Sequence, residues 1–275
     1  QSSSAEVKMA QAICNKYNVP WRQVELGSFH RYLDDWDALF SISTHSHGMY
    51  HFEFFNKILS TNINIKHLIS GIVGDAWAGN YKFIPINNAS ELESISYHHG
   101  LHIPSNYIIN KSNSLLREQF FNENKILIDD TAFQAIAMVR MKAILLSYLF
   151  RVPEKLGLSV LTPFLEPDIA LGMLTIAPEK RMNREWQKSY FRSVSILFED
   201  IAGSLDYSNT LDLQGIVKLP PPMLEKEYYS NIVADDLVEF INRKIREYVK
   251  KPQDLGLHEK KELLDAYYSY LTLLP

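Results

Sequence analysis

The stretch SGIVGDAWAGNY, residues 70–81, is the part of the sequence that decides the fold. It places three glycines, Gly71, Gly74 and Gly79, close together around an aspartate, directly after the apolar run 65–69. Glycine permits positive φ angles and close approach of the backbone to a ligand, so such a cluster after a strand is typical of a loop around a bound group. A tight strand-to-helix turn is the simpler interpretation, because short glycine motifs often occur without a ligand.

The segments before this loop alternate between helical and strand patterns. Ser3 and Glu6 have capping-box spacing at the start of the first helix, and Pro20 ends it. The predicted elements are helices over 3–17, 34–40 and 49–59 and strands over 21–26 and 65–69. This order is typical of a parallel sheet covered by helices, in which ligands lie beyond the carboxyl ends of the strands. The loop at 70–81 follows such an end.

Beyond about residue 86 helical patterns predominate, and no sustained strand alternation is found. The predicted helices lie within 131–157, 184–201, 229–251 and 259–274. The sequence therefore predicts an α/β fold, a parallel sheet covered by helices, followed by a mostly helical region.

Composition limits the classes of function. The 275 residues include 46% hydrophobic and 22% charged residues, and the formal net charge of −4 argues against a nucleic-acid or membrane-surface partner. The single cysteine, Cys14, excludes an intrachain disulfide and fits a reducing compartment; its place on an apolar helix face predicts a buried thiol. No apolar run reaches the roughly 18 residues of a membrane span and no cleavable signal pattern is found, so we expect a cytoplasmic protein.

Three stretches together resemble the synthetase domain of the asparagine synthetase family. Residues 4–20 are similar to a family helix in which an acidic residue and alanines precede a tight end, and 70–81 resemble the second glycine loop, S-G-x-G-x-D-E-x-x-G-G-Y. Residues 160–192 resemble the segment in which a Pro-Phe-Leu-acid turn is followed by K-x-x-L-R. Relatives in this family act in surface-polysaccharide and peptide-modification pathways as well as on aspartate.

The resemblance implies an ATP pyrophosphatase (HUP-like) fold that adenylates a carboxylate, releases pyrophosphate and lets a nitrogen nucleophile displace AMP. ATP and Mg²⁺ are the implied cofactors, and Asp75 matches the loop aspartate that would hold Mg²⁺ near the pyrophosphate. Lys188 matches the lysine of K-x-x-L-R and would stabilise the adenylation transition state. From the residues alone, Asp75 could equally cap the following helix, and Lys188 could be a solvated helix lysine.

The remaining implied contacts are to ATP and pyrophosphate. Ser70, Gly71 and Gly74 match the loop that would surround the phosphates, and Arg192 matches the arginine of K-x-x-L-R. The substrate implied is a small-molecule or peptide carboxylate.

The sequence also departs from the family pattern. The first phosphate loop, S-G-G-x-D-S, is absent upstream, and with it the first strand of the sheet. Either a partner chain or an upstream segment supplies this loop, or the sequence omits part of the protein, or the domain is degenerate and no longer cleaves ATP. Ile72 and Ala76 replace acidic residues of the second loop, which argues against asparagine as the product because isoleucine cannot act as a base.

The histidines form a second group of interest. His47 and His51 are four residues apart, as a helical zinc pair requires, but Gly48 stands where an H-E-x-x-H motif has glutamate. Glu53 or a distant residue could serve as a third ligand. The alternative is a set of polar side chains at a helix start near the cleft.

The sequence thus predicts residues 1–85 as a residual α/β nucleotide-binding part and 86–275 as a helical part that closes the cleft. The function expected is ATP-dependent amide formation, dependent on a separate or upstream phosphate loop. A non-catalytic scaffold or interaction protein with a degenerate synthetase fold is the alternative.

Overall fold

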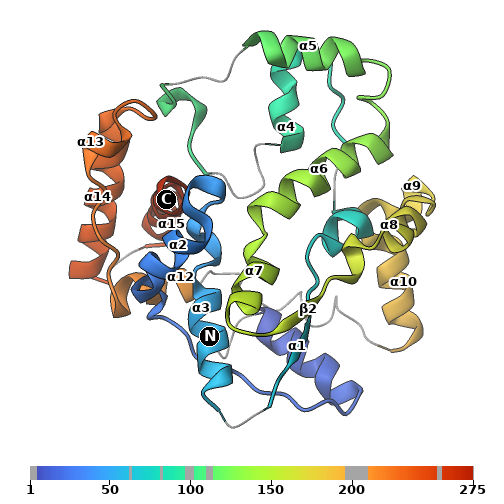
Figure 1. Cartoon of the computed structure of the whole chain (residues 1–275), viewed down its shortest axis with the longest axis horizontal. Coiled ribbons are helices and arrows are strands. Elements are labelled where there is room, and N and C mark those ends of the chain that lie inside the picture. Colours follow the sequence, from blue (N-terminus) through green and yellow to red (C-terminus); the bar gives the residue numbers. More distant parts are fainter. Residues whose placement is uncertain are drawn as a thin grey trace.

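A computed structural model describes residues 5–61, 64–80, 83–96, 102–109, 114–195, 210–252 and 256–274. Helices dominate these residues (Figure 1). The α-helices are α1 (Ala5–Lys16), α2 (Leu33–Phe40), α3 (Tyr50–Leu59), α4 (Glu93–Ser96), α5 (Ser114–Asn124), α6 (Thr131–Leu145), α7 (Tyr148–Lys155), α8 (Pro167–Leu174), α9 (Pro178–Arg181), α10 (Glu185–Ser193), α12 (Thr210–Lys218), α13 (Lys226–Tyr229), α14 (Asp235–Lys250) and α15 (Leu257–Leu273). The strands are β1 (His67–Ile69) and β2 (Ser159–Leu161).

The two strands pair in parallel, with Leu68 opposite Val160 at the centre of the register. One strand comes from each of the two predicted parts of the chain, and within the described ranges the sheet has these two strands alone. The prediction of a parallel sheet combined with a mostly helical region is confirmed at this level. β2 itself was not predicted, because three residues are too few to show an alternation.

The main core joins the beginning of the chain to its end. In Figure 1 the blue helices α2 and α3 lie beside the orange and red α14 and α15, while α8 to α10 lie on the far side of α6 and α7. The apolar residues of α14 recur every three or four positions, as a helix with one buried face requires. The largest fully buried side chains of this core include Trp36, Met49, Ile241, Ile245, Leu263, Tyr267 and Tyr270.

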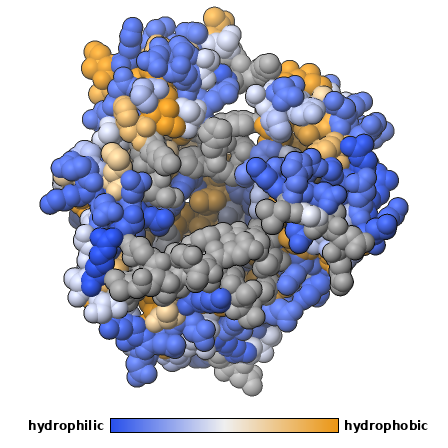
Figure 2. Space-filling model, turned by 180° about the vertical axis from the view of Figure 1, so that it is seen from behind, coloured by the Kyte–Doolittle hydropathy of each residue, from blue (hydrophilic) through white to orange (hydrophobic). Residues whose placement is uncertain are grey.

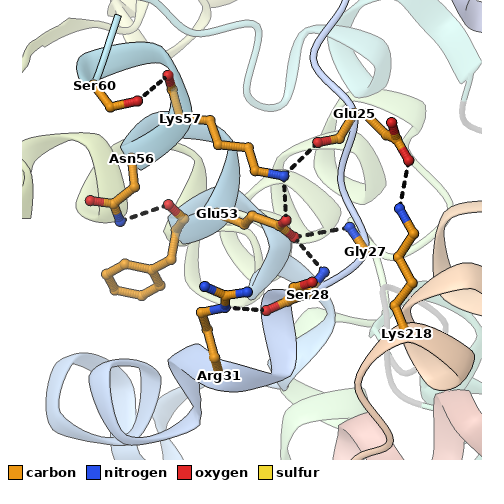
Figure 3. Close-up of polar contacts among 10 residues, drawn as sticks. Glu25, Gly27, Ser28, Arg31, Glu53, Asn56, Lys57, Ser60 and Lys218 are labelled. Carbon is orange, nitrogen blue, oxygen red and sulfur yellow. Dashed lines mark hydrogen bonds and ion pairs between the residues drawn. The ribbon is translucent and has the colours of Figure 1, made fainter.

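The predicted strand at 21–26 is wrong. Its backbone groups and those just after it bond to side chains of α3 instead of a neighbouring strand (Figure 3). Lys57 Nζ donates to the Glu25 carbonyl at 2.7 Å, and Glu53 Oε2 accepts from the amides of Gly27 at 3.0 Å and Ser28 at 2.9 Å. Since side chains of α3 satisfy the backbone hydrogen-bonding groups of this segment, the segment does not need a neighbouring strand.

The predicted helix within 131–157 is two helices, α6 and α7. The carbonyl of Leu145 accepts the hydroxyl of Thr44 at 2.6 Å, so a side chain distant in the sequence caps the last turn of α6. The Ser147 amide then bonds to Ile144 in a tighter turn before α7 begins.

At the amino end the predicted helix is confirmed as α1, whereas Ser3 lies outside the described residues. Cys14 is only partly buried, so the prediction of a buried thiol is wrong. The first helix therefore packs less completely than its apolar face suggests. No helix within the described ranges is long and apolar enough to cross a membrane.

The surface seen from behind is mostly hydrophilic, with scattered hydrophobic patches (Figure 2). Near the centre of this face lies a hollow whose floor is hydrophobic.

Candidate functional site

The glycine loop and the Pro-Phe-Leu turn lie side by side because they follow paired parallel strands. The amide of Ser70, directly after β1, donates to the carbonyl of Leu161 in β2 at 2.8 Å. Farther along, Trp77 Nε1 donates to the carbonyl of Phe164 at 2.7 Å. Two stretches that the sequence separates widely therefore meet at the carboxyl edge of the sheet, where open α/β sheets bind ligands.

Close packing accounts for two of the three glycines. A Cβ on Gly74 would lie 2.7 Å from the Phe164 ring. Gly79 has a φ of +93°, and a Cβ there would lie 1.8 Å from the carbonyl oxygen of Arg181. Gly71 has nothing within 4 Å of its Cβ position, so packing does not require a glycine there.

The loop also contains a strained residue. Val73 has a φ of +57°, which is unfavourable for a β-branched side chain, and it is buried together with Ile72. Ser70 is buried as well, and its hydroxyl accepts from the Ile72 amide at a long 3.4 Å. Such strain persists where surrounding contacts fix the backbone and is frequent at functional sites.

Asp75 is partly exposed and forms an ion pair with Lys142 of α6, with 2.5 Å between Oδ2 and Nζ. Sequence analysis did not predict Lys142, because nothing in the pattern of α6 marks it. Within the described ranges no group of three or more His, Cys, Asp or Glu side chains could hold a metal ion. Mg²⁺ on a nucleotide needs only one or two protein carboxylates, so Asp75 fits this role provided that Mg²⁺ competes with Lys142.

Lys188 and Arg192 both lie on α10 and face the same carboxylate. Glu185 is 3.3 Å from Lys188 Nζ and 3.8 Å from Arg192 Nη1, and all three side chains are about half exposed. The neighbouring Trp186 donates from Nε1 to the carbonyl of Ala78 at 3.0 Å, which joins α10 to the glycine loop. The structure therefore places the predicted lysine on an element that contacts the predicted loop.

The predicted histidine group lies at the main core, where His45 is buried and His47 and His51 are partly buried. His45 and His47 have ring centroids 4.2 Å apart, and His47 stacks on His102 at 5.2 Å. Burial, with a further contribution from its histidine neighbours, lowers the pKa of His47 to about 3. His51 lies against Tyr148 instead, at 5.2 Å. None of these residues belongs to a metal-binding group within the described ranges.

Comparison of this chain with models of protein families, with curated proteins and with solved structures finds no match.

Proposed function

We propose that this chain is part of an ATP-dependent amide-forming enzyme of the asparagine synthetase type. The observation that carries the proposal is the parallel pairing of β1 and β2, which brings the loop at 70–81 beside the turn at 162–166. In a parallel sheet this edge is where a nucleotide binds. The proposed substrate is a small-molecule or peptide carboxylate.

Each side chain has a proposed role in this chemistry. ATP, when bound with Mg²⁺, supplies the activation of the carboxylate as an acyl-adenylate. Asp75 would hold Mg²⁺ in place of its contact with Lys142, and the Gly71 region of the loop leaves room for phosphate oxygens. Lys188 and Arg192 balance negative charge that grows on the phosphates as pyrophosphate leaves.

The exposure of the sheet supports the proposal that another segment supplies the first phosphate loop. Leu68 and Val160 are partly buried, but Ile69 is 73% exposed and Leu161, paired with it, is 54% exposed. Parallel sheets are normally covered on both faces, so this apolar pair is suited to contact with a further layer. A segment that adds a strand beside β1 or β2 would carry its own loop to the same edge.

A scaffold without catalysis is the second candidate, and the ion pairs favour it. Asp75 is neutralised by Lys142, and Lys188 has Glu185 beside it. An active site needs these groups free for phosphates and magnesium, whereas a degenerate domain can keep them paired.

Native mass spectrometry of the protein purified from its natural source, with and without ATP and Mg²⁺, separates the two candidates. The enzyme proposal expects a longer or second polypeptide and a mass gain equal to a nucleotide. A chain that has no partner segment and binds no nucleotide would contradict it and leave the scaffold.

A matched pair of lysine variants tests the role of Lys188. In Lys188→Met, pyrophosphate release with ATP should fall by about 100-fold or more with nucleotide binding retained, because the lost charge acts in the transition state. Lys155→Met, at an exposed position on α7, should leave the rate unchanged. Equal rates in both variants would exclude Lys188 from the reaction.

A further inference from the structure

A small pocket, partly open to solvent, lies beside the glycine loop. It is enclosed by the π-helical turn η4 (Ala76–Asn80), the start of α6 and the end of α9. Its walls are apolar apart from two side chains, Thr131 and Arg181. The apolar residues that line it include Ala76, Phe83, Ala135, Pro178 and Met182.

Arg181 is buried in this wall, at 7% exposure. A guanidinium has five N–H donors, but the one side-chain hydrogen bond of Arg181 within the described ranges is a long 3.5 Å contact from Nη2 to Thr131 Oγ1. Among the residues that the structure describes, no carboxylate oxygen lies within 4 Å of the Arg181 nitrogens. Buried arginines are normally paired, so this one lacks the anion that its position requires.

The free donors of Arg181 are not sealed inside the protein. None of its nitrogens is among the fully buried polar atoms that lack a partner, so the unpaired donors keep contact with solvent. Arg181 is one of the residues that line the pocket. These donors are therefore available to a ligand.

The backbone of Arg181 is held in place before any ligand binds. Its carbonyl packs against Gly79, where any side chain would collide with it. The two carboxylates that directly precede α6 are already engaged: Asp130 accepts from the Phe133 amide at 2.8 Å, and Asp129 accepts from the Ile86 amide at 3.2 Å. A preorganised cation beside apolar walls favours a ligand that is anionic at one end and apolar at the other.

We propose that this pocket binds a small organic monocarboxylate, with its carboxylate on Arg181 and the Thr131 hydroxyl and its short carbon chain against Phe83 and Met182. Arginine suits this role because its planar fork can donate two parallel hydrogen bonds to one carboxylate. The proposal does not depend on ATP chemistry. It holds for an enzyme and for a scaffold.

Butyrate is the probe, and its uncharged analogue butyramide is the control ligand. We expect ligand-observed NMR and calorimetry, without ATP, to show butyrate binding below about 50 mM, as suits a fragment of this size, and butyramide binding at least tenfold more weakly. Inorganic phosphate should bind more weakly than butyrate, because it cannot use the apolar walls.

Arg181→Met tests the residue, and Lys180→Met, at an exposed position of the same helix, is the matched control. Butyrate affinity should fall at least tenfold in Arg181→Met and stay unchanged in Lys180→Met. The unfolding temperature of ligand-free Arg181→Met should stay close to that of the unmodified protein, because within the described ranges the guanidinium makes one long hydrogen bond and no ion pair. Thr131→Val should weaken butyrate binding by a few-fold and keep the fold.

The proposal is overturned if butyrate fails to bind, or if butyramide or phosphate binds as tightly as butyrate. It is also overturned if Arg181→Met and Thr131→Val both keep the butyrate affinity of the unmodified protein. A large drop in the unfolding temperature of Arg181→Met without a butyrate effect in Thr131→Val would show that the arginine is structural. None of these measurements involves ATP, so their outcomes do not depend on whether the proposed reaction is correct.

Discussion

Gly79 is the residue at which the backbone of the loop tolerates the least change. Its φ of +93° and the 1.8 Å separation between an added Cβ and the Arg181 carbonyl predict that Gly79→Ala destabilises the protein by about 3 kcal/mol or more. Gly71→Ala is the matched control in the same loop and should change stability by about 0.5 kcal/mol or less, since nothing lies within 4 Å. Urea denaturation measures both, and equal stabilities would show that the loop relaxes around the new methyl group.

Glu53 is the acidic residue with the most structural contacts at the amino end. Burial raises its pKa, but hydrogen bonds from Lys57, Gly27 and Ser28 outweigh that effect and the pKa is lowered, so the side chain is ionised (Figure 3).

Glu53→Gln should therefore cost about 2–4 kcal/mol, because a buried hydrogen-bonded charge pair is broken and Lys57 loses its partner. Glu25→Gln is the surface control: it removes the exposed pair with Lys218 and should cost much less, because solvent screens that pair. Thermal and urea unfolding distinguish the two variants. A similar small loss of stability in both would mean that the amides of Gly27 and Ser28 form hydrogen bonds with water in Glu53→Gln.

The roles of Asp75 and Lys188 stay predictions, and the structure adds where each residue lies and which side chains contact it. Asp75 and Lys188 lie on the loop and on the helix attached to it, as expected from their motifs. The ion pair of Asp75 with Lys142 was not foreseen, since a contact between distant residues leaves no mark in a single sequence. Arg181 was missed for the same reason: its isolation is a property of the pocket and has no local pattern.

At the scale of elements, helices with an apolar face and the strand within 65–69 were predictable, whereas β2 was not. α2, α3, α14 and α15 follow from their periodicity, because burying one face of a helix fixes which residues must be apolar. The alternating pattern at 21–26 gave a wrong strand prediction, since the side chains of Glu53 and Lys57 bond to backbone groups in and just after this segment. β2 has three residues and acquires its conformation from pairing with β1.

The attachment of α10 to the loop is an element-scale contact that can be tested. Trp186→Phe keeps most of the apolar contact but removes the hydrogen bond to Ala78, so we expect a stability loss of about 1 kcal/mol. Hydrogen exchange should become faster in both α10 and η4, because the two elements lose a shared anchor.

Trp21→Phe, at an exposed position, is the control and should leave exchange in α10 and η4 unchanged. Faster exchange in α10 alone would show that the loop does not depend on this contact.

At the scale of the whole molecule, the core contains histidines that are neutral when folded. Burial lowers the pKa of His30, His45 and His51 to about 4, and that of His47 to about 3. Both ring nitrogens of His51 lack a hydrogen-bond partner within the described ranges, and its neighbours are the rings of Tyr50, Phe55 and Tyr148. Protonating this residue would place an unpaired charge among aromatic side chains.

These depressed pKa values predict a loss of stability in mild acid. In the unfolded chain each histidine binds a proton below its ordinary pKa of about 6.5, whereas in the folded protein it binds one only below about pH 4. The free energy of unfolding is therefore greatest above pH 6.5 and falls as the pH drops toward 4. Each buried histidine contributes up to about 1.4 kcal/mol per pH unit in this window. The carboxylates with lowered pKa values, such as Glu53, act only at lower pH, below their ordinary value of 4.5.

Urea denaturation from pH 7.5 to 4.5 measures this loss as the slope of the unfolding free energy against pH. His51→Leu should reduce the slope below pH 6 by close to one proton, because the variant has one fewer site for the unfolded chain to protonate. His258→Gln, with a side chain that is 85% exposed, should leave the slope nearly unchanged. A flat profile between pH 6.5 and 5, or the same slope in His51→Leu as in the unmodified protein, would contradict the assignment of neutral histidines to the core. A slope that both variants reduce equally would point to general charge repulsion instead of burial.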